Sequence, residues 1–154
     1  MTRKVLLVSS SQSLDKAELA IQACAQLISD NFLVMLERDQ IEALTALGLT
    51  LPSGATEFDG SSVELAIVLG GDGSILRAAE ILRGTGSPIL GINAGHVGFM
   101  AEAESGNLIA ALEAVAQQKY EVRDRLALEV VVTTDGQESY RSWALNEVTV
   151  EKSA

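Results

Sequence analysis

A run of five apolar residues, Leu65 to Leu69, passes directly into the glycine-rich segment Gly70-Gly71-Asp72-Gly73-Ser74. An uninterrupted apolar run of this length is typical of a strand buried on both faces of a parallel sheet. Apolar residues then recur at helical spacing from Ile75 to Leu82. The sequence therefore predicts a strand, a tight glycine turn and a helix, with Asp72 at the carboxyl end of the strand.

Short apolar runs and amphipathic segments alternate through most of the chain. Pro52 and two glycines lie in the segment 49–62, which we expect to be a loop. Strands are expected at 4–9, 32–36, 65–69 and 88–92, and helices after an N-cap at Ser13, over 39–47, from residue 75 and from near Ser105. This alternation indicates α/β architecture, and we expect a three-layer domain with a parallel sheet over residues 1–119.

The pattern changes in residues 120–154. Two β-rich runs, 126–134 and 139–151, flank Asp135-Gly136, which is a typical hairpin turn. We interpret this segment as the start of a truncated β-rich domain, because a new antiparallel sheet that stopped here would leave an unpaired edge.

The overall composition excludes some classes of partner. The 154 residues carry a net charge of −10 without a cluster of Lys or Arg, which argues against a broad nucleic-acid or anionic-membrane surface. Cys24 is the single cysteine, so no disulfide can form within the chain, and its apolar neighbours predict a buried packing role. The first apolar run is too short for a signal peptide or a membrane span, so we expect a cytoplasmic protein.

The segment Gly70–Ser74 has the composition of a phosphate site. Glycines permit positive φ angles and close approach of a ligand, and backbone N–H groups at the start of a helix bind phosphate oxygens. A carboxylate at this place could accept a proton from a hydroxyl nucleophile or hold a divalent cation. The alternative is a tight turn with a solvated Asp72 near the helix cap. The pattern is neither a P-loop nor the three-glycine dinucleotide fingerprint.

Three motifs together resemble those of the NAD kinase family. Gly70-Gly71-Asp72-Gly73-Ser74 is similar to a signature that this family shares with diacylglycerol and sphingoid-base kinases. Asn93-x-Gly95-His96-x-Gly98-Phe99-Met100 and Ala144-Leu145-Asn146-Glu147-Val148 are similar to two further motifs of NAD kinases and select that family. Ser74 and Met100 replace the usual Thr and Leu, and both are mild changes.

The resemblance implies roles for individual residues. Asp72 would accept the proton of the NAD ribose hydroxyl, Gly70, Gly71 and Gly73 would form the phosphate cradle, and Asn146 and Glu147 would bind NAD. If 139–151 is one strand, Asn146 and Glu147 point to opposite faces, so a surface ion pair remains the alternative for Glu147.

Two other side chains have competing interpretations. From the helix, Arg77 could reach back to a phosphate, or instead pair with Glu80 or Glu57. His96 is the sole histidine, and we expect it to stabilise its loop through a hydrogen bond rather than bind a metal.

The expected activity is transfer of phosphate from ATP to the adenosine ribose 2′-hydroxyl of NAD, giving NADP. By resemblance, the substrates are small nucleotides, Mg²⁺ or Mn²⁺ accompanies the nucleotide without a metal site in the protein, and the full-length protein is a homo-oligomer. We expect the 154 residues alone to be inactive or nearly so. The alternatives are a diacylglycerol- or sphingoid-type lipid kinase and a non-catalytic nucleotide-binding module.

Overall fold

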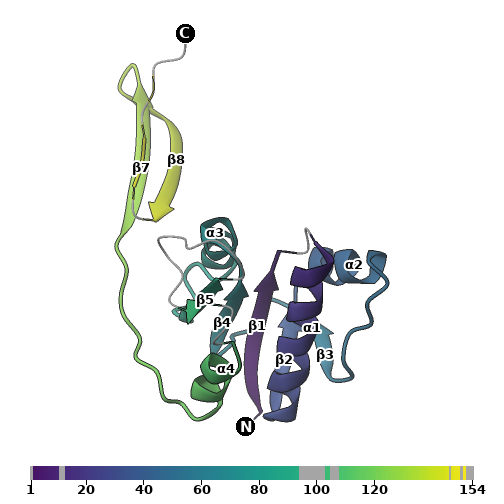
Figure 1. Cartoon of the computed structure of the whole chain (residues 1–154). Coiled ribbons are helices and arrows are strands. Elements are labelled where there is room, and N and C mark those ends of the chain that lie inside the picture. Colours follow the sequence, from purple (N-terminus) through teal and green to yellow (C-terminus); the bar gives the residue numbers. More distant parts are fainter. Residues whose placement is uncertain are drawn as a thin grey trace. The chain divides into compact units, whose positions relative to one another are not determined.

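The computed structural model describes residues 2–10, 13–93, 103–104, 108–145, 147–149 and 151, with the backbone alone at 103–104. The chain forms two compact units, Met1–Tyr120 and Glu121–Ala154. Helices and a parallel sheet make up the first unit, and a two-stranded antiparallel sheet makes up the second (Figure 1). None of the helices in the described ranges is long and apolar enough to cross a membrane.

The first unit contains a six-stranded sheet in the order β3-β2-β1-β4-β5-β6, and every neighbouring pair of strands is parallel. The strands are β1 (Arg3–Ser9), β2 (Phe32–Leu36), β3 (Ala55–Glu57), β4 (Leu65–Leu69), β5 (Ile89–Asn93) and β6 (Ala103–Glu104). The chain builds outward from β1 to β3 and then returns to place β4 on the other side of β1. The boundary between β1 and β4 is therefore the topological switch point, where ligands bind in open α/β sheets.

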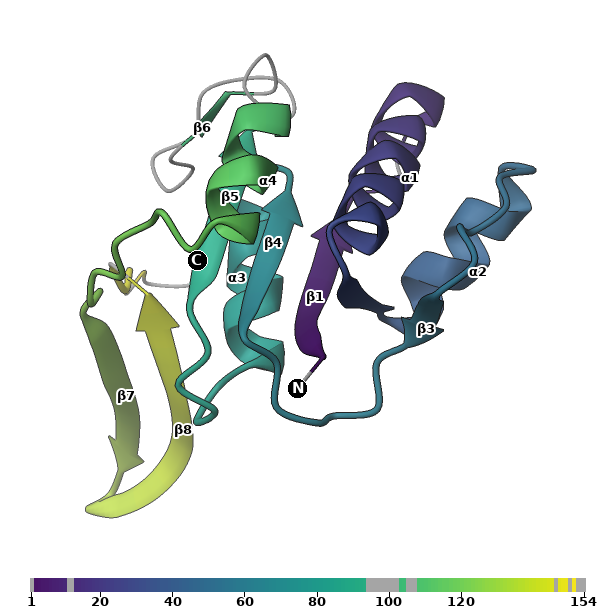
Figure 2. The same cartoon turned by 90° about the horizontal axis from the view of Figure 1, so that it is seen from below.

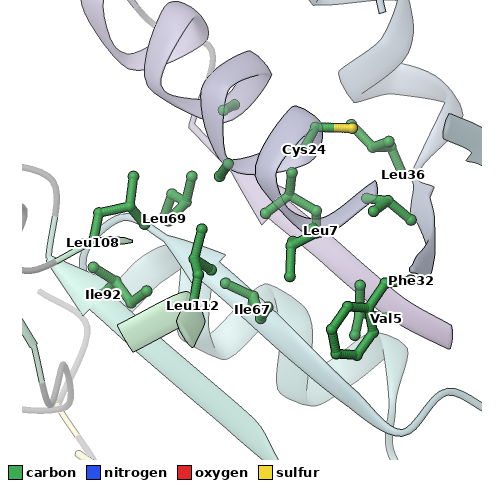
Figure 3. Packing of buried hydrophobic residues seen from close by; sticks show 14 of the residues in the cluster. Val5, Leu7, Cys24, Phe32, Leu36, Ile67, Leu69, Ile92, Leu108 and Leu112 are labelled. Atoms are coloured by element: carbon green, nitrogen blue, oxygen red, sulfur yellow. The ribbon is translucent and has the colours of Figure 1, made fainter. Parts of the chain in front are cut away.

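Helices cover both faces of this sheet, as the two views in Figures 1 and 2 show. The helices within the described residues are α1 (Leu14–Ser29), α2 (Arg38–Ala46), α3 (Asp72–Ile81) and α4 (Leu108–Ala116). On one face, residues of α1, α2 and α4 pack with the sheet, and Leu44 is the buried residue of this group from α2. Figure 3 shows Cys24 of α1 and Leu112 of α4 in the same cluster. On the other face, Ile75 and Ala78 of α3 pack on β1 and β4. The predicted three-layer α/β architecture is confirmed.

Arg3 is the first residue of β1 and connects three elements at the amino end of the strands. The glycine segment lies at the other, carboxyl end. Its Nε and Nη2 donate to the two carboxylate oxygens of Glu64 at 2.7 and 2.6 Å, and its Nη1 and Nη2 donate to the carbonyls of Ala116 and Val115 at 2.7 and 2.9 Å. These carbonyls belong to the last turn of α4, where backbone oxygens lack the regular helical partners, and the Val115 carbonyl also accepts from the Gln118 N–H at 3.1 Å. The pair with Arg3 lowers the pKa of the Glu64 carboxyl. Arg3 therefore fastens α4 to the start of β4.

The second unit is the hairpin of β7 (Ala127–Thr134) and β8 (Gln137–Leu145). Asp135 and Gly136 have φ angles of 52° and 77°, which is the geometry that favours an Asp-Gly turn between antiparallel strands. The predicted turn is correct, but the predicted end of the second strand is wrong. β8 ends at Leu145, so the described residues 147–149 and 151 lie outside any strand.

Two elements of the first unit differ from the expectations. The segment 49–62 contains the short strand β3, which pairs with β2 from Val34↔Ala55 to Leu36↔Glu57, so the loop prediction is wrong there. Ser13 is the N-cap residue of α1, but its side chain makes no capping hydrogen bond. The expected start of the last helix near Ser105 falls outside the described residues.

Candidate functional site

Gly70 and Gly71 connect β4 to α3 at the carboxyl edge of the sheet. The Gly70 N–H donates to the Ile92 carbonyl of β5 at 3.0 Å, and the N–H groups of Ser74 and Ile75 donate to the Gly71 carbonyl at 3.0 and 3.2 Å. These bonds fix the turn between β5 and the first turn of α3. Because the first amides of a helix lack helical acceptors, this turn presents N–H groups and a partial positive charge at the switch point.

The three glycines serve the turn for a different reason than predicted. Positive φ angles occur at other glycines but not at Gly70, Gly71 or Gly73, so the argument from left-handed backbone is wrong for this segment. A Cβ at Gly70 would lie 2.5 Å from Ser74 Oγ and 2.9 Å from Ser74 Cβ. A Cβ at Gly71 or Gly73 would have no neighbour within 4 Å. Gly70 is thus required by packing inside the turn, whereas the absence of side chains at Gly71 and Gly73 leaves open space beside the backbone.

A cleft of about 290 Å³ lies beside this turn. Its wall combines the end of β1, the segment from Glu37 into α2, and the first two turns of α3. The lining residues are Val8, Ser9, Ser10, Glu37, Asp39, Gln40, Ala43, Gly73, Ser74 and Arg77. The carboxyl ends of β1 and β2 and the glycine segment thus face one space, with hydroxyl, amide, carboxylate and guanidinium groups around it.

Arg77 lies in the wall of this cleft, on the second turn of α3. Its Nε donates to Glu37 Oε2 at 2.7 Å, and its Nη2 lies 3.5 Å from Asp39 Oδ2. The ion-pair partners that the sequence proposed, Glu80 and Glu57, are therefore wrong. The hydrogen bond to Glu37, together with the charges of both carboxylates, raises the pKa of the guanidinium, which stays positively charged.

Gln40 holds the end of β1 against α2. Its Oε1 accepts from the Ser9 N–H at 3.1 Å, and its Nε2 donates to Ser9 Oγ at 2.9 Å. Gln40 is buried, and burying an amide is tolerated when both of its ends are hydrogen-bonded. This pair fixes the floor of the cleft.

The structure brings part of the predicted site together. Asp72 is the first residue of α3 and is half-buried, in a position where the helix dipole favours a carboxylate. Asn93, the first residue of the second motif, is buried at the carboxyl end of β5, beside the end of β4. His96, Phe99 and Asn146 lie outside the described residues.

Glu147 lies in the second unit and is exposed. Because β8 ends before it, the strand-alternation argument about its direction does not apply.

Sequence reasoning missed Glu37, Asp39, Ser9 and Gln40. A usable signal was present, because Ser9 ends one predicted parallel strand and Glu37 follows another directly. The carboxyl ends of parallel strands meet at one edge of a sheet, so both positions belonged with Asp72 as candidates.

Within the described ranges, no three or more His, Cys, Asp or Glu side chains come together in a way that could hold a metal ion. Cys24 is buried against the sheet, and burial raises the pKa of its thiol to about 11. Cys24 therefore packs in the core, as its neighbours in the sequence predicted.

Comparison with known proteins gives a consistent family. Residues 10–120 match the ATP-NAD kinase N-terminal domain. The NAD kinase of Leifsonia xyli subsp. xyli is 41% identical over 154 residues, covering 97% of this chain and 50% of that protein. The NAD kinase of Mycobacterium tuberculosis is 55% identical over 89 residues, covering 58% of this chain and 29% of that protein.

A solved structure shows the same fold. The crystal structure of yeast NADH kinase complexed with NADH superposes with a TM-score of 0.76 at 17% identity, covering 92% of this chain and 46% of that one. The chain spans about half the length of the Leifsonia xyli NAD kinase, which it matches over 97% of its own residues. With the match over residues 10–120 and 41% identity along 97% of its length to the Leifsonia xyli enzyme, the chain belongs to the NAD kinase family.

Proposed function

We propose that this chain carries the phosphate-binding half of an enzyme that phosphorylates NAD to NADP with ATP. The observation that carries the proposal is the turn Gly70–Ser74, which lies at the switch point of the sheet and opens α3 beside a polar cleft. Family membership supports the NAD kinase reaction over the lipid-kinase alternative.

In the proposed reaction, the ribose 2′-oxygen of NAD attacks the γ-phosphorus of ATP. A new oxygen–phosphorus bond forms, the bond from the γ-phosphorus to the bridging oxygen breaks, and ADP leaves. The Asp72 carboxylate accepts the hydroxyl proton, as the resemblance implies. The first amides of α3 and the open space beside Gly71 and Gly73 would accommodate phosphate oxygens. By resemblance, Asn146 and Glu147 would contact NAD.

The described residues do not fit a metal site of the protein's own, because no cluster of ligating side chains occurs among them. Mg²⁺ or Mn²⁺ would arrive with the nucleotide, as the resemblance implies.

We further propose a cytoplasmic, homo-oligomeric enzyme that acts on small nucleotides and binds neither nucleic acid nor membranes. The net charge of −10 supports the exclusion of polyanionic partners, and the single cysteine agrees with a reducing compartment. The oligomeric state rests on the family resemblance.

The test compares the 154-residue chain with a chimera. The chimera adds the part of the Leifsonia xyli NAD kinase that lies beyond the match, and NADP is measured by enzymatic cycling. We expect the chimera to form NADP from ATP and NAD and the chain alone to form little or none. If the chimera folds by circular dichroism but makes no NADP while the Leifsonia enzyme does, the proposed function is wrong.

The role of Asp72 is tested with Asp72→Asn in the chimera. Loss of a general base lowers kcat by roughly 100- to 10,000-fold. Asp15→Asn is the matched control, because Asp15 is also an acidic residue in the first turn of a helix, α1, but lies outside the glycine segment. A chimera in which Asp72→Asn is as active as Asp15→Asn contradicts the assigned base.

A further inference from the structure

Arg77 and Glu37 come from distant parts of the chain and meet in the wall of the cleft. Glu37 directly follows β2 and is the N-cap residue of α2, whereas Arg77 lies on α3. Their side chains are 23% and 51% exposed, respectively, and the Nε–Oε2 distance is 2.7 Å. Asp39 is a weaker partner, since its side chain is 80% exposed and its oxygen lies 3.5 Å from Nη2. Glu37 is thus the main anchor of the guanidinium.

The anchor occupies only one side of the guanidinium. An arginine carries five N–H donors in a planar fork. Nε is used by Glu37 and Nη2 faces Asp39 at a long distance, while Nη1 has no partner among the described residues. The two terminal nitrogens, Nη1 and Nη2, are donors with which an arginine can bind a phosphate in a bidentate manner.

The cleft places these donors beside the phosphate-binding turn. Arg77, Gly73 and Ser74 line the same space, so the guanidinium and the first turn of α3 face a common ligand volume. A free arginine side chain must lose much rotamer freedom to bind a phosphate, and a preformed anchor reduces that loss. Charge alone would not favour a phosphate here, because two carboxylates surround one guanidinium. Glu37 therefore contributes the position of the Arg77 guanidinium and not a favourable charge.

We propose that Glu37 is a positioning residue that holds Arg77 in the cleft wall, where the guanidinium binds the polyphosphate chain of the phosphoryl donor. This inference rests on the proposed function and adds Glu37 to its machinery. The shared ligand chemistry is a polyphosphate, whether carried by ATP or present as inorganic triphosphate.

The first measurement is direct binding of ATP, and separately of inorganic triphosphate, to the 154-residue chain by calorimetry. We expect Arg77→Ala to weaken binding of both by roughly 10- to 100-fold, as for loss of hydrogen bonds to a charged group. Glu37→Ala should weaken it by about 3- to 10-fold, and Glu37→Gln by less, because the amide oxygen still accepts from Nε. Binding of ATP alone would restrict the site to a nucleotide donor, and binding of neither ligand overturns the proposal.

The double variant Glu37→Ala/Arg77→Ala separates positioning from an independent role. If Glu37 acts through Arg77, the double variant binds no more weakly than Arg77→Ala alone. Additive losses overturn the proposal. Asp39→Asn is the matched control for charge, because it removes one negative charge near the same guanidinium but keeps the 2.7 Å bond. We expect it to affect binding less than Glu37→Ala does, because an exposed, long ion pair contributes little. Tighter binding in Glu37→Ala would show that Glu37 merely neutralises Arg77, which also overturns the proposal.

Two readouts distinguish this inference from the proposed function. The Nε–H signal of Arg77 in nitrogen-edited NMR, assigned by its loss in Arg77→Ala, should exchange slowly with water in the wild type and rapidly in Glu37→Ala. In the chimera, Glu37→Ala should raise KM for ATP with little change in kcat. If the chimera makes no NADP while the NMR and binding results stand, the proposed function fails and the positioning role remains.

Discussion

Replacing Gly70 by alanine tests whether the glycine turn is constrained by its own packing. The added Cβ would lie 2.9 Å from Ser74 Cβ, whereas carbon atoms in good contact are about 3.5–4.0 Å apart. The Ser74 hydroxyl, at 2.5 Å, can rotate away, but the Cβ is fixed by the backbone of α3. The start of α3 must therefore move by roughly half an ångström or more.

The cost follows from this displacement. Overpacking of this kind destabilises a protein by about 1–3 kcal/mol. For a chain of this size the melting temperature falls by about 2–4 °C per kcal/mol, so we expect a decrease of roughly 2–12 °C. Urea unfolding should be followed by far-ultraviolet circular dichroism, because all the described helices lie in the first unit. Fluorescence of Trp143, the sole tryptophan, would report on the hairpin instead.

A second substitution identifies the clash as the cause. Ser74→Gly removes both atoms that the new Cβ meets, so the double variant Gly70→Ala/Ser74→Gly should be less destabilised than the two single effects combined, by about 1 kcal/mol or more. Gly73→Ala is the control, because a Cβ there meets nothing within 4 Å. Wild-type stability in Gly70→Ala, or strictly additive effects in the double variant, would refute the packing argument.

Three further predictions concern other parts of the chain. Gly73→Ala should stabilise α3 by about 0.5–1 kcal/mol. The same variant should lower NADP formation by the chimera, because the added methyl group enters the cleft, and unchanged activity would contradict a ligand at this place. The lowered pKa of Glu64 means that its pair with Arg3 stabilises the fold fully above the ordinary carboxyl pKa of about 4.3 and that this contribution disappears as the pH falls through the lowered value. The stability difference between wild type and Glu64→Gln in urea should therefore shrink between pH 7 and pH 3, and a constant difference would be inconsistent with the pair. With a thiol pKa of about 11 and full burial, Cys24 should react with Ellman's reagent at pH 8 only after unfolding, so rapid labelling of the native chain would place it at the surface.

The elements with strong local patterns could be predicted from the sequence. The strands β2 and β4 agree with the predicted 32–36 and 65–69 residue by residue, because five apolar residues between polar or glycine boundaries define a buried strand. The strand β3 could not be predicted in this way. It has three residues at the edge of the sheet, so burial imposes little pattern, and only its pairing with β2 defines it.

The site was predictable only where its residues are adjacent in the sequence. Asp72 and the glycines lie in one segment, and the strand before them fixed their place at the edge of the sheet. The partners of Arg77, Glu37 and Asp39, lie 40 and 38 residues before it in the sequence. Carboxylates such as Glu80 are much nearer in the sequence and were therefore the predicted partners. Choosing Glu37 required the order β2-β1-β4, which local patterns do not specify.

The same strand order explains why the glycine turn and the guanidinium of Arg77 line one cleft. Because β1 lies between β2 and β4, the segment after β2 reaches α3 only across the end of β1, where Ser9 and Gln40 form the floor. A carboxylate directly after β2 is thus placed opposite the second turn of α3, at the height of Arg77 and one turn from Gly73. The parallel order of the three strands brings Glu37, Arg77 and the N-terminus of α3 to the same end of the sheet. No additional element is needed to orient the Arg77 guanidinium toward the glycine segment.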